Sequence, residues 1–137
     1  MKTASFLVLA CVALLQAPAV LAQSRKCPAA DQIAQRHLIG AWRADIEGIA
    51  AGLRVVLKPH PQFAQTLRGT LQRYAQRVEL AGDVVDGELT LEESINGTNI
   101  TATWLGEVVP GSCGREIRGS WKAERMQGEH PFVLKKQ

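Results

Sequence analysis

The sequence predicts an all-β fold, a single antiparallel up-and-down barrel of about eight strands preceded by a short N-terminal helix. From residue 38 almost to the end, apolar and polar residues alternate with a period of two, which is typical of half-buried antiparallel strands. Short turns separate the runs, so each strand can pair with the next, and closure of such a meander removes its exposed edges. The outward positions are heavily charged, whereas a membrane barrel needs an apolar outer band. We therefore expect a soluble barrel.

Residues 1–22 have the features of a secretory signal peptide. Lys2 precedes a short apolar run, and the segment closes on small residues ending at Ala22. The run is shorter than the roughly 20 residues that span a bilayer. Cleavage before Cys11, as in a lipoprotein, is the alternative, but it would leave few apolar residues before the cut. We expect cleavage after about Ala22, a periplasmic or secreted protein, and one domain over residues 23–137.

The elements of this domain follow in order. A short amphipathic helix is expected over about residues 28–37, because Ala30, Ile33 and Ala34 recur at helical spacing after Pro28. Strands follow over about residues 38–136, and they alternate in the same way. We expect them at 38–46, 53–58, 66–74, 77–84, 88–92, 100–108, 116–124 and 132–134.

The two cysteines of the mature chain test this topology, because successive turns of a meander alternate between the two ends of the barrel. We call the end where the chain enters the first strand the near end; it also holds the turns around 59–64, 82–87 and 110–114. The far end holds 47–52, the turn after Tyr74, 96–98 and 125–130. Cys27 and Cys113 both fall at the near end, so we expect them to form a disulfide that pins the helix there. A metal or redox pair is the rival interpretation, but the sequence has no Cys-x-x-Cys motif and no His beside either cysteine.

Two overlapping Asn-x-Thr triplets, at Asn96 and Asn99, lie between the fifth and sixth expected strands. Asn96-Gly97 suits a two-residue hairpin turn, which needs φ > 0 at both central positions. In a bacterium we favour the turn alone. In a eukaryotic secretory pathway the exposed tip would also be a glycosylation acceptor.

Three Trp residues, Trp42, Trp104 and Trp121, sit between small residues on the expected inward face. They either fill the core, as in other small barrels, or line a ligand pocket. The Gly40-Ala41-Trp42 motif resembles the N-terminal Gly-x-Trp signature of the calycins, the lipocalin and avidin-like barrels. The resemblance covers only these residues. It implies the barrel architecture, weakly supports ligand binding, and makes Lys135 the candidate for the basic residue that packs over the Trp.

The charged residues give no convincing catalytic, metal or cofactor site. An acidic segment containing Asp83 and Asp86 falls at the near end with His60 and Glu116, which is the only basis for an acid–base or metal site. It lacks the ligand spacing of calcium loops and zinc sites, and turn chemistry explains its Asp and Gly residues equally well. We therefore expect no cofactor, no metal and no enzymatic activity.

Two functions remain open. The first is a non-catalytic protein that binds a small apolar or aromatic ligand in or at the mouth of the barrel through Trp42, Trp104, Trp121 and Ile49. The second is a protein-binding module, such as an inhibitor or immunity-type protein acting on a secreted hydrolase through its loops. Ile49, in an apolar Gly-rich loop, is a lid or partner contact, or else folds back onto the barrel.

The formal net charge is +3, and +2 without residues 1–22. So small a net charge argues against a nucleic-acid partner, and we expect no membrane insertion.

Overall fold

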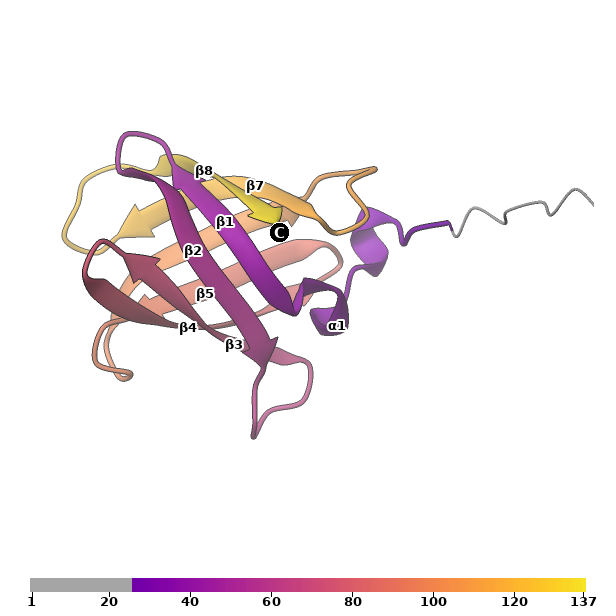
Figure 1. The fold of residues 1–137 in the computed structure, drawn as a ribbon, viewed down its shortest axis with the longest axis horizontal. Helices are drawn as coiled ribbons and strands as arrows, with labels where there is room; N and C mark the ends of the chain where they lie inside the picture. Colours follow the sequence, from indigo (N-terminus) through magenta and orange to yellow (C-terminus); the bar gives the residue numbers. More distant parts are fainter. Residues whose placement is uncertain (1–25) are drawn as a thin grey trace, which may run out of the picture.

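A computed structural model describes residues 26–137, so the expected signal peptide and its cleavage site lie outside the described residues. Eight strands form one closed barrel in which each strand pairs with the next and β8 pairs with β1 (Figure 1). All pairings are antiparallel, and the predicted up-and-down barrel is confirmed. The strands are β1 (Gly40–Ile46), β2 (Ala50–Pro59), β3 (Thr66–Arg73), β4 (Gln76–Val85), β5 (Glu88–Ser94), β6 (Ile100–Val108), β7 (Glu116–Ala123) and β8 (His130–Lys136). Within residues 26–137, no helix has the length and apolar character needed to cross a membrane.

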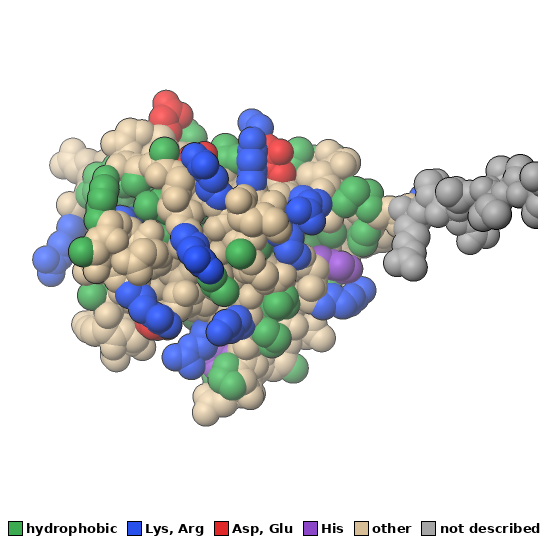
Figure 2. Space-filling model, viewed as in Figure 1, with side chains coloured by type: hydrophobic (Ala, Val, Ile, Leu, Met, Phe, Trp, Pro, Cys, Tyr) green, Lys and Arg blue, Asp and Glu red, His purple; other side chains and the backbone are tan. Residues whose placement is uncertain are grey.

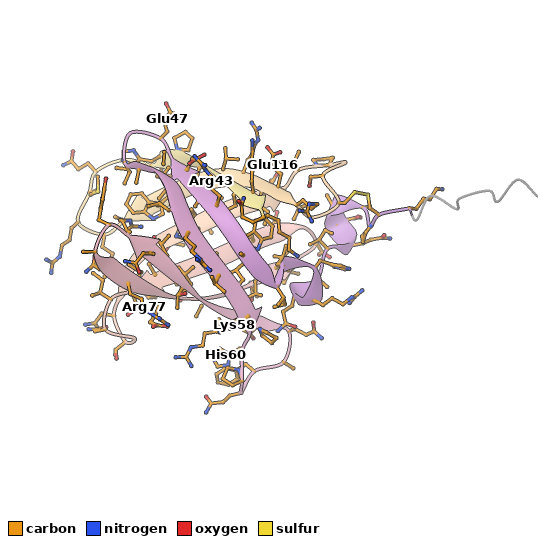
Figure 3. All side chains as sticks on the ribbon, viewed as in Figure 1. Arg43, Glu47, Lys58, His60, Arg77 and Glu116 are labelled. Carbon is orange, nitrogen blue, oxygen red and sulfur yellow. A yellow bond between two sulfur atoms is a disulfide. The ribbon has the colours of Figure 1, made fainter. Side chains whose placement is uncertain are left out.

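The barrel interior is one apolar core built from alternate residues of every strand. Trp104 and Phe132 meet edge to face there, with ring centroids 4.8 Å apart. Close strand contact depends on small residues: Gly106 and Gly119 are direct cross-strand partners, and a Cβ at Gly119 would lie 1.9 Å from the Leu105 carbonyl oxygen. Charged side chains such as Arg43, Lys58 and Arg77 point away from the barrel, as the alternation predicts (Figure 3).

The segment that covers the near end is not the continuous helix expected over residues 28–37. It consists of a 3-10 turn, η1 (Ala30–Gln32), and a single-turn helix, α1 (Gln35–Leu38), separated by extended backbone at Ile33 and Ala34. The break lets Ile33 turn inward, where it is buried and faces Gly114. Burial of this side chain outweighs helix continuity, because so short a helix gains little from propensity alone.

A disulfide between Cys27 and Cys113 joins this segment to the β6–β7 loop, with Cα atoms 5.2 Å apart. The predicted pairing is therefore confirmed. The Trp42 indole donates a hydrogen bond to the Leu38 carbonyl (2.8 Å), and the basic residue over its ring is Lys136, 5.9 Å from the centroid. Lys135, the residue proposed from the calycin resemblance, instead occupies an exposed position on β8. The architecture is compatible with a calycin-like fold.

The turn at Asn96-Gly97 differs from the expected two-residue hairpin. Five residues, 95–99, separate β5 from β6, and Asn96 does not adopt a positive φ. The Asn96 side chain organises the loop instead, because its Oδ1 accepts hydrogen bonds from the backbone N–H groups of Thr98 and Asn99. The two-residue turn with φ > 0 at both central positions lies between β4 and β5, at Asp86 (φ 51°) and Gly87 (φ 81°).

Candidate binding site at the far end

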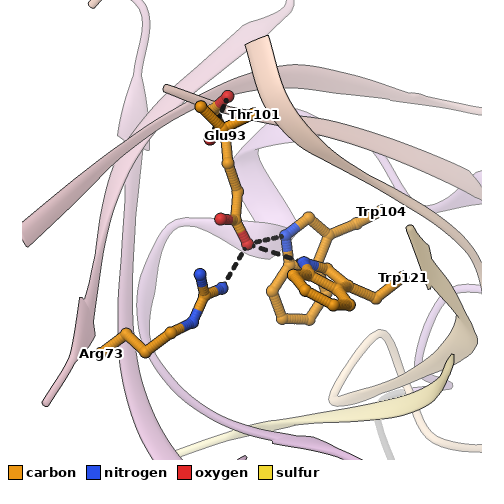
Figure 4. Close-up of polar contacts among 5 residues, drawn as sticks. All are labelled: Arg73, Glu93, Thr101, Trp104 and Trp121. Atoms are coloured by element: carbon orange, nitrogen blue, oxygen red, sulfur yellow. Dashed lines mark hydrogen bonds and ion pairs between the residues drawn. The ribbon is translucent and has the colours of Figure 1, made fainter. Parts of the chain in front are cut away.

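A buried carboxylate lies inside the far end of the barrel. Glu93 is 1% exposed, and one of its oxygens, Oε1, accepts three hydrogen bonds (Figure 4). The indole N–H groups of Trp104 and Trp121 donate at 2.9 Å and 2.8 Å, and the Arg73 guanidinium donates through Nη2 at 2.6 Å. Buried charges are tolerated when they are paired and hydrogen-bonded in this way.

Strand register brings these four side chains together. Glu93 continues the inward alternation of Leu89 and Leu91 on β5, so it enters the barrel rather than the solvent. Trp104 and Trp121 are direct cross-strand partners on β6 and β7, so both indoles reach the same oxygen. Arg73 is the last residue of β3, and its side chain reaches across the barrel mouth to the carboxylate. Three strands other than β5 thus contribute the donors.

An open cavity of about 870 Å³ lies above this cluster. Its floor is polar and contains Arg73, Glu93 and Trp121. Its walls come from the β5–β6 and β7–β8 loops and the adjoining strand ends. The wall residues are Ile95, Asn96, Thr98, Asn99, Ile100, Thr101, Ala102, Ala123, Glu124, Arg125 and Met126.

The floor presents the partly exposed Arg73 guanidinium over the almost wholly buried Glu93 carboxylate. The Arg73 side chain is 18% exposed, and its Nε–H is buried without a partner among the described residues. Its guanidinium lies 5.3 Å from the Trp121 ring centroid, so it is held by the indole face as well as by the carboxylate. Since the three donors share Oε1, the second carboxylate oxygen receives none of these bonds. A polar group at the floor can therefore meet a fixed charge pair with hydrogen-bonding capacity.

The four residues expected to bind ligand take different positions. Trp121 lines the cavity, and Trp104 lies just beneath it as a donor to Glu93. Trp42 lies at the near end, buried under Lys136. Ile49 is half-buried, folds back against the core and lines a separate surface hollow beside Pro131 and Val133. The structure therefore brings Trp104 and Trp121 together and separates them from the other two.

The near-end acidic residues do not assemble with His60. Among residues 26–137, no group of three or more His, Cys, Asp or Glu side chains is arranged to hold a metal ion. His60 and Glu116 point from different sides of the barrel (Figure 3). The His60 ring is used locally, because its Nδ1 accepts the backbone N–H groups of Gln62 and Phe63.

The near-end segment has a pH-sensitive contact. His37 Nδ1 accepts the backbone N–H of Ala34 at 2.9 Å, which requires that nitrogen to be unprotonated. Burial, followed by the positive charges of Arg36 and Lys136, lowers the pKa of His37 from its ordinary value of 6.5. The contribution of neutral His37 to stability is thus complete above pH 6.5 and is lost as the pH falls through the lower, folded-state pKa.

We expect the amide protection factor of Ala34 to fall as the pH is lowered below 6.5, through the lowered pKa of His37. The core amides of β5 and β6 are expected to keep theirs. Hydrogen exchange followed by NMR measures both, and a His37→Gln variant is expected to remove the pH dependence. A His60→Gln variant is the control and should leave it unchanged. If the His37→Gln variant kept the pH dependence of the wild type, a group other than His37 would control the protection of the Ala34 amide.

No protein-family model and no curated protein sequence matches this chain significantly. Glu93 and Arg73 are the site residues that the sequence did not single out. The signal for Glu93 was its place two residues after Leu91 on an inward face.

Proposed function

We propose that this protein is a non-catalytic binding protein that holds a small amphiphilic ligand in the far-end cavity. The observation that carries the proposal is the combination of a concave cavity, whose wall presents apolar as well as polar side chains, with a buried, hydrogen-bonded charge pair at the floor. Binding sites for small molecules are typically concave and apolar, with few polar groups that fix orientation. The disulfide supports a further part of the proposal, that the protein works in an oxidising, periplasmic or extracellular compartment.

The cavity suggests how such a ligand would lie. Its apolar part would pack against Ile95, Ile100 and Met126, each of which is substantially exposed in the structure. Burial of those side chains by a ligand would remove apolar surface from water. Its polar end would reach Arg73 and Glu93. Trp121 lies at the cavity floor, whereas Trp42 lies at the near end. We therefore expect ligand binding to change the fluorescence of Trp121 but not that of Trp42.

Binding is tested with N-phenyl-1-naphthylamine, a neutral amphiphilic dye that becomes fluorescent in apolar sites. We expect saturable binding at one site in the wild-type protein. An Ala123→Trp variant places an indole in the cavity wall and is expected to weaken binding at least about tenfold, a loss of about 1.4 kcal/mol. The matched control is Lys122→Trp, which adds the same indole at the exposed neighbouring residue and should bind as the wild type does. Absence of saturable binding, or equal loss in both variants, would contradict the proposed site.

A second candidate function, protein binding through the loops, is favoured by exposed apolar residues around the same end. Tyr74, Ile95 and Met126 are exposed on three different far-end loops. Exposed apolar groups that cluster in this way often mark contact surfaces. If this function holds, serine variants of Tyr74 and Ile95 should lose co-purification of one stoichiometric secreted protein. If instead these variants only weaken dye binding, the small-ligand function is supported.

A further inference from the structure

One face of the barrel wall carries a row of basic side chains, although the net charge of the whole chain is small. Cross-strand pairing places Lys135, Arg43 and Arg54 directly beside one another on β8, β1 and β2. The row continues through Gln72 on β3 to Arg77 on β4. Since neighbouring strands lie about 4.8 Å apart, the row spans roughly 19 Å of the barrel wall.

A second basic pair lies on the same face, towards the near end. Lys58 on β2 and Arg68 on β3 are direct cross-strand partners, and both are exposed. Figure 2 shows Lys and Arg side chains spread over this face, with few acidic ones among them. We call the six residues Arg43, Arg54, Lys58, Arg68, Arg77 and Lys135 the basic face.

Carboxylates of the same wall offset only part of this charge, and Glu116 on β7 is the cross-strand partner of Lys135. Asp45 lies 3.7 Å from Arg43, and Glu79 lies 3.6 Å from Arg77. Both are exposed ion pairs of the kind that contributes little to stability. Arg43 against Arg54 and Lys58 against Arg68 place like charges directly opposite each other, an arrangement that destabilises a sheet. An anionic partner would relieve this repulsion.

Exposed aromatic residues lie at both ends of β3, next to the basic face. Phe63 is 61% exposed in the loop before β3, and Tyr74 is 80% exposed in the turn after it. These are the exposed Phe, Tyr or Trp side chains of residues 26–137; the others are buried. The loop of residues 60–65 protrudes beyond the strands that it connects (Figure 1). Strand β3, between the two loops, has eight residues and spans roughly 26 Å at about 3.3 Å per residue.

We propose that the basic face docks the protein on the surface of an anionic phospholipid bilayer. Basic side chains are attracted to anionic headgroups, and aromatic side chains favour the interfacial region. A bilayer fits this face better than a polynucleotide does. The cations are spread in two dimensions over a convex wall, and the aromatic residues stand at its two ends rather than between the cations, where bases would stack. The far-end cavity is not needed for this contact, so the inference is independent of the proposed ligand.

Co-sedimentation with vesicles tests the proposal, with N-terminal sequencing to confirm that all samples begin at the same residue. We expect binding to vesicles containing phosphatidylglycerol, little binding to pure phosphatidylcholine, and loss of binding at high salt. Each basic residue near an anionic surface contributes about fivefold to partitioning. The double variant Arg54→Gln with Lys58→Gln is therefore expected to bind about 25-fold more weakly.

A matched control distinguishes this face from net charge. Lys122→Gln with Arg118→Gln removes the same charge from exposed positions on β7, and we expect less than about a twofold change. A Phe63→Ser with Tyr74→Ser variant should also bind more weakly, although its charge is unchanged. Equal losses in the two charge variants would overturn the proposal, and so would equal binding to neutral vesicles. Binding to heparin or an oligonucleotide with the same variant dependence, but not to vesicles, would assign the face to a soluble polyanion instead.

Discussion

Replacing Glu93 by alanine is expected to lower the free energy of unfolding by about 3–5 kcal/mol, the usual effect of removing one partner from a buried charge pair. The variant would leave the indole N–H groups of Trp104 and Trp121 without their acceptor, and Arg73 without its counter-charge. Each unsatisfied buried donor costs about 1–3 kcal/mol. Urea unfolding followed by Trp fluorescence measures the loss.

The control for this prediction is the neighbouring residue. Glu92 is exposed on the outward side of β5, so Glu92→Ala should change stability by less than about 0.5 kcal/mol. Glu93→Gln retains an acceptor oxygen and should fall between the two. If Glu93→Ala were as stable as Glu92→Ala, the hydrogen-bonded cluster would not exist in solution.

Removal of the disulfide is expected to have a comparable effect. Cys27 and Cys113 are separated by 86 residues, and the chain-entropy model assigns a loop of that size about 4–5 kcal/mol. The bridge also ties the near-end segment, with its buried Ile33, to the β6–β7 loop. A Cys27→Ser with Cys113→Ser variant should therefore unfold at a lower urea concentration, and its near-end amides should exchange faster.

The far end provides the internal control, because the disulfide lies at the opposite end of the barrel. Dye binding by the folded double-serine variant should match that of the wild type. A stability loss below about 1 kcal/mol would contradict the chain-entropy argument for this loop. Loss of dye binding in the folded variant would show that the two ends are coupled.

Alternation and turn spacing were sufficient to predict the barrel, the order of its strands and the end at which the cysteines meet. These features depend on local pattern and on the topology of a meander. The break in the N-terminal helix was not predictable in the same way. It depends on the position of Ile33 against Gly114, which lies 81 residues further along the chain.

The site itself depends on the strand register, which is not evident from the sequence alone. Glu93 looked like one more residue of an acidic segment, although its spacing from Leu91 placed it on the inward face. That Trp104 and Trp121 both reach its carboxylate follows only from their direct pairing across β6 and β7. The basic face was hidden for the same reason. Lys135 and Arg43 are distant in sequence and adjacent only because β8 closes the barrel against β1.

The three indole N–H groups allow the most direct test of the far-end site. In a ¹H–¹⁵N NMR spectrum, each Trp side chain gives one signal, which Trp→Phe variants can assign. On titration with N-phenyl-1-naphthylamine, we expect the signals of Trp104 and Trp121 to shift, because both indoles donate to Glu93 at the cavity floor. The signal of Trp42, bonded to Leu38 at the near end, should stay in place. Saturable binding that shifts only Trp42, or none of the three, would contradict the account.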